Sequence, residues 1–372
     1  MTEAAGRERY TISSIHLLCV MYVSIVDVSL MGFQREVVND AGYDAWMSVL
    51  LAGLGVHLLL RLIFGIVSRY EPSNATIVAI NNFCFGRAVG SVLNAAFMAF
   101  ALLGAFLTYR SYLEMCKLWI FPTMNFWPFS LLFLVLLYYA VNGGLQAVAG
   151  ICFWGLLSSL LFVAPFSMML IPYLHPVNLM PAFDHSFAEV MRSSKQMAAQ
   201  YIGFEVLLVA YPLLQHPSSS RKWAHAGVLL STCMFLWLLL AAFMYFSRGQ
   251  ILHTIWPTLN MISVLEIPLM QRLEYLILSI WLIKILANIS LGLWAVCHSA
   301  KLAFRAKPRI VLVVCLLLFA VLQGAIKDLN DIQPIRTLYN QVGLWFLYAF
   351  IPLLFVLTWL RRRKRISPLK YT

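Results

Sequence analysis

The sequence predicts an all-α polytopic membrane protein whose ten transmembrane helices form two inverted halves of five. Three observations predict it. Hydrophobic residues make up 62% of the 372 residues and charged residues only 11%, whereas a soluble domain carries about 25% charged residues. Ten apolar stretches approach the roughly 20 residues that a spanning helix needs. The first and sixth stretches are interrupted by polar residues and glycine, which is typical of a binding site near the middle of the membrane.

The ten predicted spans follow one another with short loops, so we expect a single integral membrane domain over residues 1–372. Residues 1–146 hold spans 1–4 and a turn, 147–196 hold span 5 and an outer loop, 197–360 hold spans 6–10, and 361–372 form a basic cytoplasmic tail. The expected spans are Ser14–Phe33, Asp44–Ser68, Arg87–Tyr109, Phe126–Ala140, Ala147–Leu170, Met197–Leu214, Trp223–Phe246, Tyr275–Cys297, Ile310–Ala325 and Gly343–Leu360.

The net charge of +12 reflects membrane orientation and not nucleic-acid binding. With both termini in the cytoplasm, the inner loops and the run Arg361–Arg365 hold more than half of the 27 lysines and arginines. Such a bias is expected of the cytoplasmic face of a membrane protein. The terminal run is therefore expected to orient the last helix and to contact anionic lipid.

Catalytic and metal-binding patterns are lacking, so we expect neither an enzyme nor a cofactor. The sequence has no P-loop, no GxSxG and no HExxH motif. Its seven cysteines are scattered without a CxxC pair and suit apolar packing. The outer loop Pro172–Gln196 leaves two interpretations open, a metal site or an ordinary hydrated loop, of which we favour the second. Its candidate ligands are His175, Asp184, His185 and Glu189.

The two interrupted spans contain the sharpest candidates for ligand binding. Span 1 places an acid, a hydroxyl and a glycine within one apolar stretch, and span 6 places a glycine beside an acid. An ionisable group at the bilayer centre costs roughly 2.5–3.5 kcal/mol on insertion scales, so it persists where it faces a cavity or a partner. The candidates are Asp27, Val28, Ser29 and Gly32 in span 1 and Gly203, Phe204 and Glu205 in span 6.

Each acid has a functional and a structural interpretation. Asp27 and Glu205 either bind an ammonium group, a cation or a proton, or pair with an intramembrane base such as Lys284 or Arg61. Glu205 has a further structural alternative, which is to accept hydrogen bonds from backbone groups freed at the break. In the functional case, half-helix N-termini bind the carboxylate of an amino-acid zwitterion.

Spans 3 and 8 supply the remaining candidates for the pocket wall. Lys284 and Asn288 share a helix face; they either face the cavity or serve as a buried counter-ion. Phe97 and Phe100 either line the pocket or pack between helices.

The segment Gly203-Phe204-Glu205 is followed by an apolar run and Pro212. Other short motifs along the chain are Arg35-Glu36-Val37, Gly42-Tyr43-Asp44-Ala45-Trp46, Thr76-Ile77-Val78, Trp256-Pro257-Thr258, Glu266-Ile267-Pro268 and Arg272-Leu273-Glu274. Together these motifs resemble the B subunits of spore germinant receptors, which belong to the amino acid–polyamine–organocation transporter superfamily. The first of them resembles the family's GFE break.

The resemblance implies a ten-helix fold of the leucine-transporter type in the inner membrane of a bacterial spore. It also implies assembly with an A subunit and a lipoprotein C subunit. In that family the B subunit is thought to sense a nutrient germinant, often an amino acid, and binding triggers ion release and germination.

Three departures from the family pattern bear on the ligand. The glycine-rich break, roughly G-V-G-I-L in the family, reads Asp27-Val28-Ser29-Leu30-Met31 here. Gln34 stands where the family has a proline before R-E-V. In the turn after span 4, Gln146 and Gly150 stand where the family has two charged residues. An acid in the break favours a cationic or amine-bearing germinant.

We therefore expect a nutrient-sensing B subunit that responds to its ligand by a conformational change. The alternatives are a proton- or sodium-coupled amino-acid transporter and a ligand-free structural subunit of a membrane complex.

Overall fold

The computed structural model describes residues 11–123, 125–265, 272–326 and 329–361. The expected segment Glu266-Ile267-Pro268 and the basic tail beyond Arg361 lie outside the described residues. Within the described ranges, seven helices are long and apolar enough to cross a membrane, and three shorter apolar helices accompany them.

In the described part of the chain the helices group into ten segments that correspond to the ten expected spans, which confirms the predicted fold class. In chain order they are α2 (Ser14–Ile25) with η1 (Val28–Met31) and α3 (Phe33–Ala41); α4 (Ala45–Val67); α5 (Ile77–Trp119); α6 (Trp127–Asn142); α7 (Gly144–Leu170); α8 (Phe187–Ala199) with η6 (Phe204–Val206), α9 (Leu207–Ala210) and η7 (Tyr211–Leu213); α10 (Pro217–Tyr245); α13 (Leu273–Phe304); α14 (Pro308–Ala325); and α15 (Leu329–Trp345) with η8 (Phe346–Phe350) and α16 (Ile351–Leu360).

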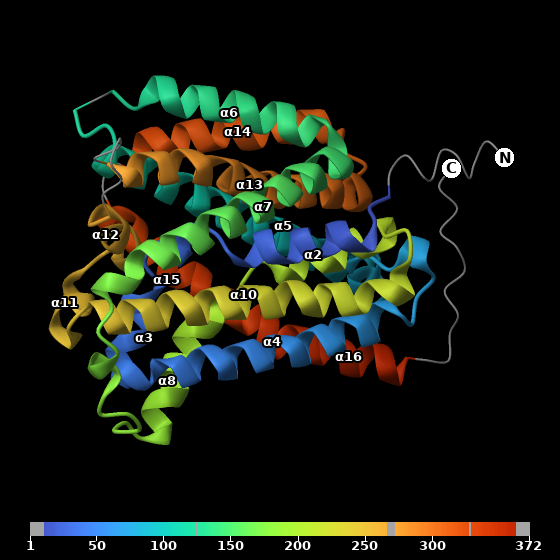
Figure 1. Ribbon diagram of the computed structural model, residues 1–372. Coiled ribbons are helices and arrows are strands. Elements are labelled where there is room, and N and C mark those ends of the chain that lie inside the picture. Colours follow the sequence, from blue (N-terminus) through green and yellow to red (C-terminus); the bar gives the residue numbers. More distant parts are fainter. Residues whose placement is uncertain (1–10, 124, 266–271, 327–328, 362–372) are drawn as a thin grey trace.

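Helix α2, the first half of span 1, lies near the centre of the bundle (Figure 1). Helix α2 packs between α7 and α10, and α13 packs against α5 and α7. We call the end where α2 begins and α16 finishes the near end. The opposite end, where the short helices α11 (Arg248–His253) and α12 (Pro257–Ser263) lie, is the far end.

Span 1 is interrupted where the sequence predicts it. Ser13 caps the start of α2, and α2 stops at Val26, whose backbone is extended. One carboxylate oxygen of Asp27 accepts a hydrogen bond of 2.7 Å from the backbone N–H of Ser29 and so begins η1. The acid inside the apolar stretch is therefore the residue that caps the next helical turn.

Span 6 is interrupted at Gly203, but its first half begins earlier than expected. Helix α8 starts at Phe187, ten residues before the expected Met197. Ser186 and Glu189 form a capping box there, so Glu189 lies in a helical turn and not in a loop. The polar residues of α8 lower its hydropathy, and hydropathy alone therefore misses it.

Gly203 is the point at which the two broken spans touch. Its φ of +131° suits glycine, and a Cβ added there would lie 2.0 Å from the carbonyl oxygen of Ser24. No side chain fits at that position. The glycine therefore both breaks span 6 and lets it cross the end of α2.

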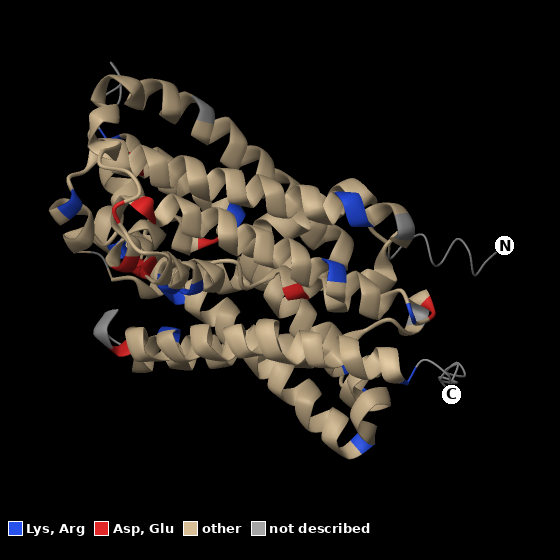
Figure 2. Cartoon of the chain, turned by 90° about the horizontal axis from the view of Figure 1, so that it is seen from below, with Lys and Arg blue, Asp and Glu red and all other residues tan. Residues whose placement is uncertain are grey.

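Spans 3 and 10 also extend beyond their expected limits. Helix α5 continues ten residues past Tyr109, and span 10 begins with α15 well before Gly343. Both extensions contain charged residues, among them Arg110, Glu114 and Arg336, which end a hydropathy window but are tolerated when buried against protein. In Figure 2 the acidic residues lie mainly toward the far end and the middle of the bundle.

Candidate functional site at the broken helices

Two neighbouring cavities lie between the broken spans and helices α5, α13 and α15. Each has a volume of about 70 Å³. By this measure one water occupies roughly 10–15 Å³, so each cavity has room for several waters or a small polar ligand. They share the wall residues Asp27, Gly104, Thr108, Ile202 and Tyr339.

The cavities differ in their position along the bundle. The one toward the far end, the far cavity, is also lined by Val28, Ser29, Glu36, Leu107, Ser111, Ala199, Gln200, Arg336 and Asn340. The one toward the near end, the near cavity, is also lined by Ser24, Phe97, Ala101, Ala105, Gly203, Glu205, Val206, Asn288, Leu291, Gly292 and Ala295.

Asp27 is the acid that both cavities share. Its second carboxylate oxygen accepts a hydrogen bond of 3.1 Å from the hydroxyl of Thr108 on α5. A carboxylate has about four acceptor positions, so the cap on Ser29 and the bond from Thr108 leave capacity for a ligand. The side chain is partly exposed to the cavities, and a bound ammonium group would find its counter-charge there.

Glu205 satisfies the backbone at the break in span 6. It is 6% exposed, and its carboxylate accepts a hydrogen bond of 2.7 Å from the backbone N–H of Gly203. It also borders the near cavity. Glu205 therefore accepts a hydrogen bond from the backbone freed at the break and also borders a cavity.

We expect replacement of Glu205 by alanine to lower the amount of folded protein more than replacement by glutamine. Glutamine keeps an acceptor for the Gly203 N–H, whereas alanine leaves that group buried and unpaired, a loss of about 1–3 kcal/mol. Immunoblots and thermal unfolding in nanodiscs measure the difference. Equal losses for both variants would show that the charge matters and the hydrogen bond does not.

Lys284 and Asn288 occupy different surroundings although they share a helix face. Lys284 is fully buried outside both cavities, and its ammonium lies 4.1 Å and 5.0 Å from the ring centres of Trp281 and Tyr22. Among the described residues its Nζ has no hydrogen-bond partner. Asn288 borders the near cavity. Its side-chain amide donates a hydrogen bond of 2.8 Å to the carbonyl of Val23 and so caps the end of α2.

The remaining predicted residues divide between the cavity walls and the packing behind them. Val28 and Ser29 line the far cavity, and Phe97 and Gly203 line the near one. Gly32 lies outside both, where a Cβ would approach the carbonyl of Ile255 to 2.7 Å.

Two phenylalanines stand behind the wall. Phe100 stacks on Tyr339 with ring centres 4.7 Å apart, so it positions a residue that borders both cavities. Phe204 is fully buried and lines neither cavity.

The polar wall at the far end is not predicted by the sequence pattern. Arg336, Tyr339 and Asn340 lie at i, i+3 and i+4 on α15, a spacing that places them on one face of a helix. The expected start of span 10 at Gly343 put them in a loop. Glu36, in the segment Arg35-Glu36-Val37, lines the same cavity and accepts a hydrogen bond of 2.7 Å from Gln200.

Comparison with known proteins places this architecture in a family. The family model described as spore germination protein matches residues 11–332. The chain is 32% identical over 354 residues to the spore germination protein GerQB of Bacillus cereus, covering 94% of this chain and 96% of that protein. The chain belongs to the spore germination protein family.

A more distant relative and a solved structure are consistent with the family and the fold. The spore germination protein YndE of Bacillus subtilis (strain 168) is 21% identical over 323 residues, covering 86% of this chain and 88% of that one. The structure of Mhp1, a nucleobase-cation-symport-1 family transporter in a closed conformation with bromovinylhydantoin bound, superposes with a TM-score of 0.63. At 12% identity it covers 96% of this chain and 80% of Mhp1 and shows the shared leucine-transporter-like fold.

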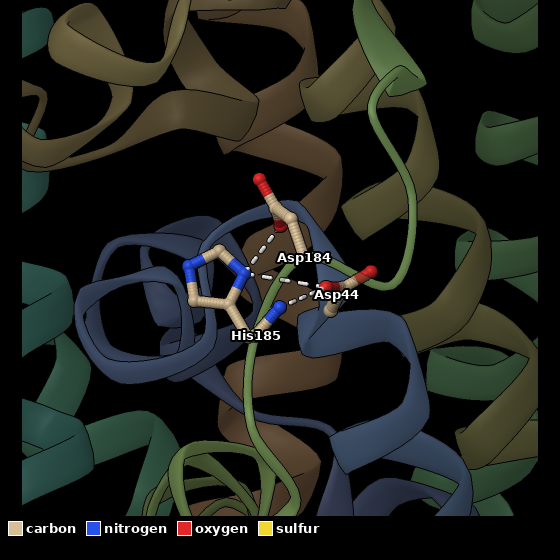
Figure 3. A group of neighbouring side chains, drawn as sticks. All are labelled: Asp44, Asp184 and His185. Carbon is tan, nitrogen blue, oxygen red and sulfur yellow. Dashed lines mark hydrogen bonds and ion pairs between the residues drawn. The ribbon is translucent and has the colours of Figure 1, made fainter.

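At the far end of this spore germination protein, Asp44, Asp184 and His185 form a second polar cluster (Figure 3). Ligand atoms of all three lie within 4.8 Å of one another. Their oxygens are engaged by the protein itself. Asp44 accepts hydrogen bonds of 2.7 Å from the backbone N–H of Phe183 and of 3.1 Å from that of His185. Asp184 accepts two hydrogen bonds of 3.1 Å from Arg248. The cluster therefore ties the loop before α8 to α4 and α11.

The pKa of Asp184 lies below its ordinary value. Partial desolvation opposes the shift, but the hydrogen bonds and positive charge of Arg248, together with His185, outweigh it. A depressed carboxyl pKa stabilises the fold above the ordinary value of about 4 and loses that effect as the pH falls through the folded-state value.

We therefore expect the start of α8 to become more mobile when the pH is lowered below about 4. A spin label at Phe187→Cys, where the side chain is 75% exposed, reports this in a Cys233→Ser background. With Asp184→Asn added, mobility should already be raised at pH 7. A label at Leu229→Cys on α10 serves as the control. An unchanged spectrum at Phe187→Cys down to pH 3 would contradict the role given to Asp184.

Proposed function

We propose that this chain is the nutrient-sensing B subunit of a spore germinant receptor and that its ligand is a small molecule with an ammonium group, an amino acid above all. The observation that carries the proposal is the position of Asp27. Its carboxylate stands at the break of span 1, in the wall shared by two cavities, with acceptor capacity left over. GerQB, a relative of this chain, is named a spore germination protein.

The mechanism follows from the position of the break. A ligand held by Asp27 also contacts the opposite broken span, because Ile202 borders both cavities. Ligand that binds one arrangement of the two spans more tightly than the other shifts the population toward that arrangement. The shift then passes to an A subunit and a lipoprotein C subunit, the partners that the family resemblance implies.

We place the receptor in the spore inner membrane with both termini in the cytoplasm. The loops and helix ends at the near end carry Arg69, Arg221, Lys222, Lys301, Arg305, Lys307 and Arg309. A cytoplasmic face attracts such residues. The far cavity then lies on the side from which a germinant arrives.

The second candidate is an ion-coupled amino-acid transporter, which the likeness to Mhp1 favours. In transporters of this kind, carbonyls at the end of a broken helix coordinate sodium. Here the side-chain amide of Asn288 donates hydrogen bonds to the carbonyls of Val23 and Ser24, at 2.8 Å and 3.4 Å. That contact disfavours sodium coupling and leaves proton coupling as the transporter alternative.

Two assays test the proposal. Spores whose only receptor contains this chain, with its A and C subunits, are exposed to the twenty amino acids and to simple amines while germination is followed by the fall in optical density. Proteoliposomes containing the chain alone are tested for uptake of the labelled compound that works best. Germination without uptake supports a sensor. Uptake at transporter-like turnover would make the chain a transporter, and no response to any amino acid or amine would overturn the ligand class.

A further inference from the structure

Arg336 is the basic residue in the wall of the far cavity. It projects from α15 and donates a hydrogen bond of 2.6 Å to the hydroxyl of Ser111 on α5. Its Nε is buried and has no hydrogen-bond partner among the described residues. A guanidinium carries five N–H donors, so most of the donor capacity of this side chain is unused by the described protein groups.

The acids near Arg336 leave it available. Glu36 lines the same cavity as Arg336. Within the described part of the chain, no ion pair shorter than 4.0 Å joins the two, and the carboxylate of Glu36 is held by Gln200 at 2.7 Å. Asp27 stands in the cavity wall as well, tied to span 1 and to Thr108.

The far cavity thus presents a guanidinium from span 10 and a carboxylate from the break of span 1. A guanidinium offers a planar pair of donors that matches a carboxylate, whereas a lysine offers a point charge. Ser111 holds Arg336 in place, which reduces the entropy lost when a ligand binds. A small zwitterion satisfies both groups at once, and a simple amine satisfies only one.

We infer that Arg336 binds the carboxylate of the germinant while Asp27 binds its ammonium group, so that the receptor selects α-amino acids over amines and amino-acid amides. The inference rests on the proposed function and adds the residue that sets specificity. Such a ligand links span 1 to span 10, which gives a reason for the response to require both charged groups.

The test compares each amino acid with its carboxamide in spores that carry the full receptor. L-alanine, L-leucine and L-lysine are paired with L-alaninamide, L-leucinamide and L-lysinamide, and the concentration for a half-maximal germination rate is measured for each. In the wild type, we expect the effective amino acid to act at a concentration roughly 10- to 100-fold lower than its amide.

In Arg336→Gln that advantage should fall to within about threefold. The half-maximal concentration of the amino acid should rise, while that of the amide should change little. The ratio for Arg336→Lys should lie between those of the wild type and Arg336→Gln. Ser111→Ala should raise the half-maximal concentration of the amino acid, because it removes the hydroxyl that positions Arg336. Arg192→Gln on α8, where the side chain is 65% exposed, is the matched control and should keep the wild-type ratio. Receptor level is followed by immunoblot in every strain.

The outcomes separate the two proposals. No response of the wild type to any of the twenty amino acids, to simple amines or to the three amides overturns the proposed ligand class and this inference with it. A wild type that responds equally to amino acid and amide, or an Arg336→Gln strain that keeps the wild-type ratio, overturns the inference alone. If Arg336→Gln lowers the receptor level, the ratio is read from Arg336→Lys and Ser111→Ala.

Discussion

Replacing Asp27 with asparagine is expected to raise the germinant concentration for a half-maximal response by at least about 30-fold, since removing one member of a buried, hydrogen-bonded charge pair loses roughly 2–5 kcal/mol. Asparagine is as good a helix cap as aspartate. It can still accept from the N–H of Ser29 and exchange a hydrogen bond with the hydroxyl of Thr108. The substitution therefore removes the charge and keeps the local structure.

The measurement is spore germination across the amino-acid panel, with receptor level checked by immunoblot. Asp40→Asn is the matched control: Asp40 lies on α3, its side chain is 25% exposed, and it approaches Arg192 only to 4.0 Å. A normal response of the Asp27→Asn spores at a normal receptor level would show that the acid is structural and that the ligand lies elsewhere.

Replacing Gly203 with alanine should reduce the folded protein severely. The new Cβ would lie 2.0 Å from the carbonyl oxygen of Ser24, a backbone atom that cannot turn aside, and 2.9 Å from its carbon. The φ of +131° adds backbone strain of order 1–3 kcal/mol for any residue other than glycine. The crossing of the two broken spans would have to open, and both cavities depend on that crossing.

Receptor level in spores and the thermal unfolding of purified protein measure this effect. Gly150→Ala on α7 is the control, because its Cβ would meet nothing within 4 Å and its backbone is helical. We expect Gly150→Ala to keep or slightly raise stability, as alanine favours a helix by up to about 1 kcal/mol over glycine. Wild-type levels of Gly203→Ala protein would contradict the close crossing.

The two breaks can be predicted from the sequence because their cause is local. An acid and a glycine within an apolar span, at Asp27 and Gly203, interrupt the helix whatever packs around them. The ends of spans 6 and 10 were harder to predict, because α8 and the first half of α15 carry polar residues on one face. Hydropathy averages over both faces and so places such helices in loops.

The amino-acid sequence by itself determined the membrane class, the number of spans and the two points at which they break, because the bilayer acts on each segment separately. The tertiary structure decided which partner each polar side chain takes. Asn288 caps a helix 265 residues earlier in the chain, Lys284 lies between two rings, and Arg336 enters the cavity beside Asp27. These outcomes depend on which helix faces meet across the bundle, and residues so far apart in sequence carry no local pattern that predicts their contact.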